Sequence, residues 1–256
     1  MSNHHFTAAI FDLDGVITKT AQLHAQAWKD AFDAFLKRRA SREGAPFEPF
    51  DIASDYKRFV DGKPRYDGVR SFLAARSIGL PEGAPEDEAD KETVHGLGNK
   101  KNERFHELLE KKGVATYDDA VELLTRWRRQ GLQTAMVTSS RNGAAILAAA
   151  ELGDQFDATI DGVDAERMNL EGKPAPDIFL EAARQLDVEP REAIVLEDAI
   201  AGVEAGRDGE FGLVVGVARD EGESENALRE HGANLVFSDL RKVRLDQIAE
   251  RDPNAT

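Results

Sequence analysis

Short apolar runs recur along the chain, and most of them end in polar or acidic residues. Such runs cover residues 8–11, 134–137, 158–160, 193–196, 213–217 and 235–237. Continuous apolar runs of this length, rich in Val and Ile, are typical of strands that are buried on both faces. The pattern therefore predicts strands in a sheet that is covered on both sides.

Stretches with helical patterning lie between these runs. Residues 118–130 carry apolar side chains near helical spacing, residues 142–152 are rich in Ala and end before Gly153, and residues 177–186 follow Pro176. Gly after a helix and Pro before one are common at helix ends. Alternating strands and helices predict an α/β fold, with a Rossmann-like parallel sheet flanked by helices.

Residues 20–112 have a different pattern. Trp28, Phe32, Phe35 and Leu36 mark one apolar helical face, and residues 71–76 and 102–112 are also typical of helices. The stretches 41–50 and 77–85 are interpreted as loops or insertions, the second from its Gly and Pro content. No strand pattern stands out. We expect an α-helical cap domain at 20–112, inserted into a core of 1–19 and 113–256.

Composition narrows the class of protein. The chain has 256 residues, 41% of them hydrophobic, and a formal net charge of -15, which disfavours nucleic acids and anionic membranes as partners. It has no cysteine, so disulfides, thiolate nucleophiles and Cys-type zinc sites are excluded. No apolar run approaches the ~20 residues of a membrane helix, and no signal-peptide pattern is visible. We expect a soluble cytoplasmic protein.

Polar residues follow several of the expected strands, namely Asp12, Asp14, Thr138, Glu197 and Asp198. Ligands bind at the carboxyl ends of strands in parallel sheets, so these side chains are expected to converge. Neighbouring carboxylates repel each other unless a cation lies between them, and Mg²⁺ suits oxygen ligands. Taken one by one, these residues also fit plain turns and helix caps. Their combination favours a site.

Two further segments suit an anionic group. Thr138, Ser139 and Ser140 precede an expected helix, where hydroxyls and backbone N–H groups bind anions. Lys173 lies in a Pro-rich turn and could act as a point charge on phosphate. Simple capping and a surface lysine are the alternative interpretations. The sequence has no P-loop, no dinucleotide-binding glycine motif and no Gly-x-Ser-x-Gly elbow.

These motifs together resemble the haloacid dehalogenase superfamily. Residues 11–18 (FDLDGVIT) resemble its first motif, Thr138 the second, Lys173 the third and Glu197-Asp198 the fourth, in the same order and spacing. His24, Trp28, residues 62–65 (GKPR) and residues 173–179 (KPAPDIF) are similar to the β-phosphoglucomutase-like subfamily.

The resemblance implies a role for each motif. Asp12 would be the nucleophile that forms an aspartyl phosphate, and Asp14 the general acid and base. Mg²⁺ would be held by the Asp12 carboxylate, the Asp14 carbonyl and the Glu197-Asp198 pair. Thr138 and Lys173 would bind the oxygens of the transferring phosphoryl group.

The resemblance also implies a substrate. Arg65 would grip the distal phosphate of a sugar bisphosphate, and His24 would help position Asp14, with packing against Trp28 as its alternative role. The expected substrate-binding residues are Thr18, His24, Arg65, Lys101, Asn102, Ser139, Ser140, Arg141 and Asn142. The implied enzyme is a monomeric phosphomutase that interconverts β-glucose 1-phosphate and glucose 6-phosphate. A sugar phosphatase stays the alternative, because residues 38–50 and 79–90 lengthen the cap.

Overall fold

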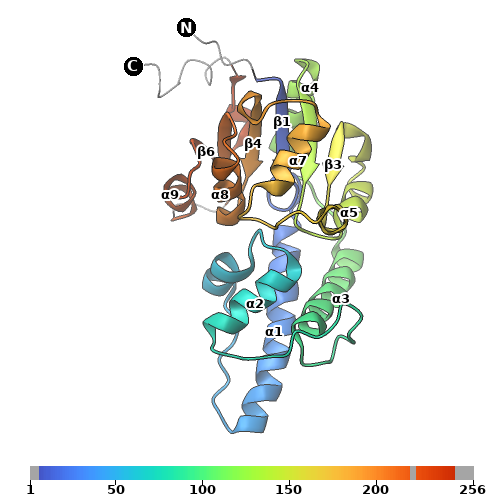
Figure 1. Cartoon of the computed structure of the whole chain (residues 1–256), viewed down its shortest axis with the longest axis vertical. Coiled ribbons are helices and arrows are strands. Elements are labelled where there is room, and N and C mark those ends of the chain that lie inside the picture. The colour runs from blue at the N-terminus through green and yellow to red at the C-terminus, as the bar shows by residue number, and fades with distance from the viewer. Residues whose placement is uncertain (1–5, 220–222, 246–256) are drawn as a thin grey trace. The chain divides into compact units, whose positions relative to one another are not determined.

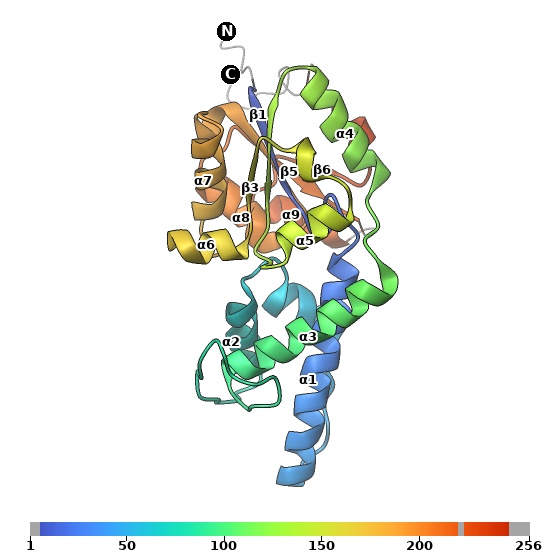
Figure 2. The same cartoon turned by 90° about the vertical axis from the view of Figure 1, so that its right-hand side faces the viewer.

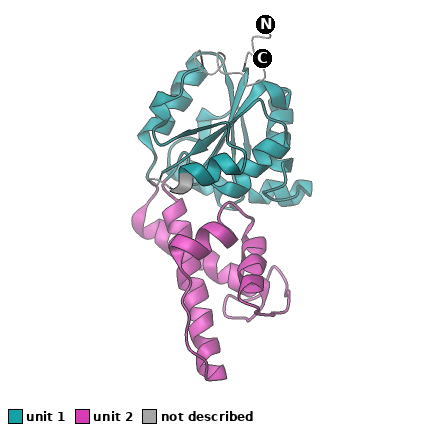
Figure 3. Cartoon of the chain, turned by 90° about the vertical axis from the view of Figure 1, so that its left-hand side faces the viewer, with its two compact units in different colours: residues 1–18, 115–256 teal, residues 19–114 magenta. Residues whose placement is uncertain are grey.

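The computed structural model describes residues 6–219 and 223–245, and the chain forms two compact units. Unit 1 contains residues 1–18 and 115–256, and unit 2 contains residues 19–114 (Figure 3). The chain therefore leaves unit 1 after its first strand and returns to it before the second.

Unit 1 is built on a parallel six-stranded sheet, as the apolar runs predict. The strands lie in the order β3-β2-β1-β4-β5-β6, and every neighbouring pair is parallel. They are β1 (Ala8–Asp12), β2 (Gln133–Val137), β3 (Ala158–Ile160), β4 (Ala193–Glu197), β5 (Leu213–Val217) and β6 (Leu235–Phe237). Each apolar run identified in the sequence is confirmed as a strand.

The register of the sheet decides which residues meet at its carboxyl edge. Asp12 of β1 lies opposite Val137 of β2, and Phe11 lies opposite Leu196 of β4. The residues that end or follow these three strands therefore lie side by side. The strand order reverses direction between β1 and β4, and such a point is where open α/β sheets bind their ligands.

Helices cover both faces of this sheet. They are α4 (Asp118–Arg129), α5 (Gly143–Ala149), α6 (Gly162–Met168), α7 (Asp177–Gln185), α8 (Ile200–Asp208) and α9 (Glu223–Glu230), with the 3₁₀ turns η2 (Gly153–Gln155), η3 (Pro190–Glu192) and η4 (Leu240–Lys242). Figure 2 shows α7 on one side of the sheet and α4 and α5 on the other. On the face that α4 covers, the ring of Trp127 in α4 lies 5.9 Å from the ring of Phe11 in β1. These two rings fill the space between the helix and the sheet.

Unit 2 is helical, as expected. It contains α1 (Ala21–Glu43), the π-helical segment η1 (Ile52–Val60), α2 (Arg65–Ala75) and α3 (Val94–Lys112), all labelled or visible in Figure 1, and no strand occurs between residues 19 and 114. Its core is aromatic: the ring of Phe32 lies 4.1 Å from that of Phe72 and 5.2 Å from that of Phe50. Burying side chains of this size stabilises the unit by about 1.5–3 kcal/mol each.

Three boundaries in unit 2 differ from the sequence prediction. α2 and α3 begin before residues 71 and 102, because tertiary packing outweighs the low helix propensity of their glycines. A Cβ on Gly68 would lie 3.3 Å from Trp28, so the absence of a side chain allows this close packing. α1 runs into the predicted loop 41–50 and ends at Gly44, whose φ of 66° gives a left-handed C-cap.

None of the helices in the described parts of the chain combines the length and the apolar character that crossing a membrane would require.

Candidate active site

A buried lysine joins two carboxylates at the carboxyl edge of the sheet. Asp12 is the last residue of β1, Glu197 is the last residue of β4, and Lys173 lies in the turn before α7. The Lys173 Nζ donates to Asp12 Oδ1 at 2.6 Å and to Glu197 Oε1 at 2.7 Å. The three side chains are only 1%, 9% and 1% exposed for Lys173, Asp12 and Glu197. Charges buried this deeply need partners, and each of these has one.

A second carboxylate follows Asp12 and is oriented by a hydroxyl. Thr138, directly after β2, donates its Oγ1 hydrogen to Asp14 Oδ2 at 2.8 Å. The backbone N–H of Ser140 in turn donates to Thr138 Oγ1 at 3.0 Å. The Thr138 hydroxyl therefore has a fixed direction, and it fixes one oxygen of Asp14.

Three acidic side chains form a group that fits a divalent cation. Asp12, Glu197 and Asp198 each offer a carboxylate oxygen, and these oxygens lie within 4.8 Å of one another. Oxygen-rich clusters of this kind suit hard ions such as Mg²⁺. The second oxygen of Glu197, Oε2, accepts from the backbone N–H of Ala199 at 2.7 Å, which holds this side chain in place.

Two glycines make room for these carboxylates. Gly15 has a φ of 94°, and a Cβ there would lie 1.8 Å from Asp198 Oδ2. A Cβ on Gly202, in α8, would lie 1.7 Å from Glu197 Oε1. Any larger residue at these positions must displace an acidic side chain, because no atoms approach this closely.

Burial and charge perturb the two central groups. Burial, together with the nearby Glu197 and Asp14, raises the pKa of Asp12 well above its usual value, although the Lys173 ammonium opposes this shift. Burial alone would lower the pKa of Lys173, but the carboxylates of Asp12 and Glu197 outweigh burial and raise it. Lys173 therefore stays a cation, and its positive charge favours the anionic form of Asp12 against the effect of burial.

The loop after Thr138 turns tightly before α5. The backbone N–H of Asn142 donates to Ser140 Oγ at 3.2 Å, and the Ser140 carbonyl accepts from Gly162 N at 2.9 Å. Arg141 forms an ion pair with Glu166 of α6. Ser139, Ser140, Arg141 and Asn142 thus lie on one loop at the carboxyl end of β2.

Thr18 closes the turn that carries Asp14. Its side chain is buried, and its Oγ1 donates to the Leu13 carbonyl at 3.0 Å. The Thr18 backbone N–H donates to the same carbonyl at 2.9 Å. In the structure this residue therefore shapes the loop around Asp14.

The remaining predicted residues lie in unit 2 and form two contacts there. Arg65, the first residue of α2, donates from Nη2 to Asn102 Oδ1 of α3 at 2.7 Å. The Lys101 Nζ lies 2.5 Å from His24 Nδ1. An ammonium can only donate, so this imidazole nitrogen accepts. The alternative role for His24 was packing against Trp28, and in the structure its ring stacks on that of Phe105, with ring centroids 4.0 Å apart.

Two further residues at this site, Arg219 and Gly202, are not predicted by the sequence pattern. Arg219 follows β5, at the same edge of the sheet as the other polar residues, and this position was the available signal. Gly202 has no such signal, because its role depends on how closely α8 approaches Glu197.

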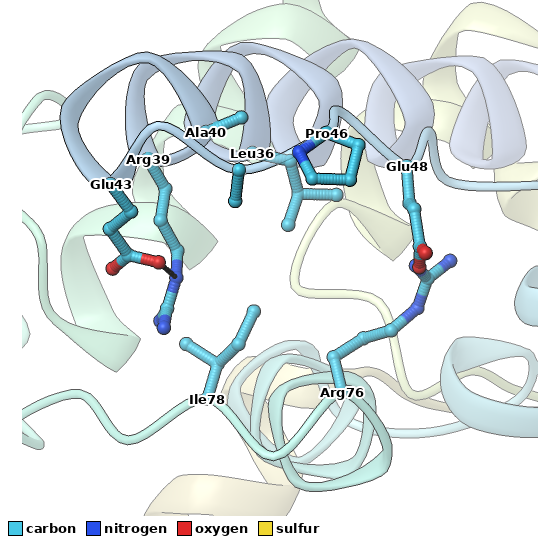
Figure 4. A pocket seen from close by; sticks show the side chains of 9 residues that line it. Leu36, Arg39, Ala40, Glu43, Pro46, Glu48, Arg76 and Ile78 are labelled. Atoms are coloured by element: carbon cyan, nitrogen blue, oxygen red, sulfur yellow. Dashed lines mark hydrogen bonds and ion pairs between the residues drawn. The ribbon is translucent and has the colours of Figure 1, made fainter.

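Unit 2 also contains a pocket of about 150 Å³, shown in Figure 4. Its charged side chains are paired with one another: Arg39 with Glu43, and Arg76 with Glu48. The lining residues are Leu36, Arg39, Ala40, Glu43, Ala45, Pro46, Glu48, Arg76 and Ile78. None of the predicted site residues lines it.

Comparison with known proteins agrees with this geometry. The model of the haloacid dehalogenase-like hydrolase family matches residues 6–209. A protein named β-phosphoglucomutase from Mycobacterium tuberculosis is 48% identical over 237 residues, which cover 92% of this chain and 90% of that protein. A β-phosphoglucomutase from Bacillus subtilis is 32% identical over 247 residues, covering 95% and 94% of the two chains.

Among solved structures, a hydrolase from Pseudomonas syringae superposes with a TM-score of 0.73 at 25% identity and covers 94% of this chain and 99% of its own. The family model extends over most of the chain and includes Asp12, Thr138, Lys173 and Glu197. The chain therefore belongs to the haloacid dehalogenase-like hydrolase family.

Proposed function

We propose that this chain is a Mg²⁺-dependent hexose phosphomutase that interconverts β-glucose 1-phosphate and glucose 6-phosphate. The observation that supports it most is the arrangement around Asp12, a buried carboxylate beside the Lys173 cation and two further acids. The 48% identity to a protein named β-phosphoglucomutase supports the choice of reaction.

Unit 1 is the catalytic core in this proposal, and unit 2 is the cap. An Asp12 oxygen attacks phosphorus and forms an aspartyl phosphate, while the bond from phosphorus to the sugar oxygen breaks. The phosphoryl group then passes from Asp12 to the free hydroxyl of a sugar monophosphate, which forms the bisphosphate, and Asp12 takes the phosphoryl group from the other position to release the isomerised product. Lys173 and Thr138 bind the phosphoryl oxygens, so their charge and dipole stabilise the charge that spreads over them.

Asp14 transfers the proton in both directions. Its carboxyl group gives a proton to the departing sugar oxygen and takes one from the attacking hydroxyl. The hydrogen bond from Thr138 to Asp14 Oδ2 supports this role, because it fixes the orientation of the Asp14 carboxyl group.

Mg²⁺ would be held by the carboxylates of Asp12, Glu197 and Asp198 and by the Asp14 carbonyl. When bound, the ion supplies positive charge that offsets the repulsion between an anionic substrate and the acidic side chains. The 4.8 Å grouping of the three carboxylates supports this assignment.

The distal phosphate of the bisphosphate is assigned to Arg65, together with Asn102 and Lys101 of α3. The planar guanidinium can bind two phosphate oxygens, and its hydrogen bond to Asn102 orders it for that purpose. His24 would assist Asp14, and Thr18 and the loop 139–142 would contact the sugar phosphate. The monomeric state and the cytoplasmic location stay predictions from the sequence.

The test is a panel of sugar phosphates assayed for isomerised product and free phosphate together. A mutase gives glucose 6-phosphate from β-glucose 1-phosphate with little free phosphate. Phosphate release without isomerisation would instead identify the sugar phosphatase that the family's description as hydrolases allows. Asp12→Ala is expected to abolish turnover of every substrate, and retained turnover would contradict the assignment of the nucleophile.

Arg65→Ala tests the binding of the distal phosphate separately from phosphoryl transfer at Asp12. Losing a charged hydrogen bond costs about 1.5–3 kcal/mol, so mutase turnover is expected to fall about 10- to 150-fold. Hydrolysis of a small phosphate ester, which has no second phosphate, should change much less. Arg70→Ala, on the exposed side of the same helix, is the matched control. Equal losses for both substrates would contradict the assignment of Arg65 to the distal phosphate.

A further inference from the structure

Arg219 touches the turn that carries Asp14, although it lies more than 200 residues away in the sequence. Its Nε donates to the Gly15 carbonyl at 3.2 Å, and its Nη2 donates to the Val16 carbonyl at 2.9 Å. These two peptide groups directly follow Asp14. The orientation of the backbone beside Asp14 is therefore tied to one guanidinium group.

The turn at residues 13–18 is closed by its own backbone hydrogen bonds. Gly15 N donates to the Thr18 carbonyl at 2.8 Å, and the Leu13 carbonyl accepts from Ile17 N at 3.1 Å. The carbonyls of Gly15 and Val16 take no part in that closure and instead accept from Arg219. Arg219 thus adds a fixed external contact to a short turn whose left-handed glycine makes it dependent on such support.

Arg219 is in turn held on its other side. Its Nη1 donates to Asp119 Oδ2 at 2.8 Å, and its guanidinium lies 3.8 Å from the centre of the Tyr117 ring. Asp119 Oδ2 also accepts from the backbone N–H of Leu240 at 2.8 Å. The Arg219 side chain is only 14% exposed, so its position is set from several directions.

The same segment also contacts the turn directly. Tyr117 N donates to the Ile17 carbonyl at 2.8 Å, and Thr18 pairs with Thr116 as an isolated β-bridge. Both crossings of the chain between the units, at residues 18–19 and 114–115, adjoin these contacts. Arg219 therefore bonds the Asp14 turn and the segment 116–119 to each other.

We infer that Arg219 is a positioning residue that holds Asp14 in the orientation needed for proton transfer to and from the sugar oxygen. This inference rests on the proposed role of Asp14 as general acid and base. Lysine cannot replace this contact, because three acceptors in different directions require the planar fork of a guanidinium.

The test compares substrates that differ in their need for a proton. The oxygen leaving a hexose phosphate must be protonated, whereas the phenolate leaving p-nitrophenyl phosphate needs no proton. For Arg219→Lys we expect kcat on the hexose phosphate to fall about 10- to 100-fold, a part of the 10²–10⁴ that general acids contribute. The KM should change little, and p-nitrophenyl phosphate turnover should fall less than about threefold.

Two further variants calibrate this comparison. Asp14→Asn should show the same selective loss in a larger form. Arg126→Lys is the matched control, because Arg126 also donates from a part-buried side chain to a carbonyl, that of Val243, without touching the turn. It should leave the ratio of the two turnover rates unchanged.

The inference would be overturned if Arg219→Lys left the ratio of the two turnover rates unchanged, whether by equal losses on both substrates or by no loss on either. Thermal melting checks that the variant is folded. A variant that does not fold would show that these contacts serve the stability of unit 1, which also contradicts the inference. A wild-type protein that hydrolyses hexose phosphates without isomerising them would refute the proposed mutase and leave this test valid, because hydrolysis needs the same proton.

Discussion

Replacing Lys173 by methionine tests the electrostatics of the site most directly. The substitution keeps much of the side-chain volume and removes the only charge between Asp12 and Glu197 in the described structure, where Nζ lies 2.6 and 2.7 Å from their oxygens. Both carboxylates then stay buried without their shared cation. Removing one partner of a buried ion pair costs about 3–5 kcal/mol, and in a chain of this size that corresponds to a Tm lower by roughly 6–20 °C.

Urea and thermal denaturation in the presence of a chelator measure this cost without a competing metal ion. Lys100→Met is the matched control: Lys100 pairs with Glu103, its side chain is 39% exposed, and its loss should cost no more than about 1 kcal/mol. Adding Glu197→Gln to the Lys173 variant removes one of the two stranded charges and should restore part of the lost stability. A Lys173→Met protein as stable as the wild type, or no recovery in the double variant, would refute the reasoning.

Two other outcomes follow from the same geometry. Gly202→Ala places a Cβ 1.7 Å from Glu197 Oε1, so it should lower stability by about 1–3 kcal/mol and weaken Mg²⁺ binding measured by calorimetry, whereas Gly153→Ala, with nothing within 4 Å, should be nearly neutral. Although burial opposes ionisation, hydrogen bonds from Arg219 and from the Leu240 backbone lower the pKa of Asp119. Its contribution to stability is therefore present above its unfolded pKa of about 3.9 and is lost as the pH falls through the lower folded value. The difference in unfolding free energy between wild type and Asp119→Asn should be largest at neutral pH and vanish in acid; a constant difference would contradict this account.

The sequence predicted elements well where the pattern was local. The apolar runs at β1 and β5 contain no turn residue except Gly216, so the local pattern alone predicts these two strands. α2 was predicted too short because Gly68 weakens the helical pattern, while its contact with Trp28 exists only in the folded unit. The same reasoning explains α3, which begins after the Thr93 cap and has glycines at positions 96 and 98 in its first two turns.

For the site, the sequence by itself determined which side chains end the strands and which chemistry those side chains allow. Asp12 and Glu197 could be placed at one edge because parallel strands end together. The tertiary structure alone decided that Lys173 lies between these two carboxylates, that α8 approaches Glu197 at a glycine, and that Arg219 bonds the turn after Asp14. The physical reason is range: periodicity and helix caps are set by neighbours a few residues apart, whereas the contacts of Lys173 and Arg219 join residues 24 to 204 positions apart and depend on strand order. Gly202 lies near Glu197 in the sequence, but its contact depends on how closely α8 packs against that side chain.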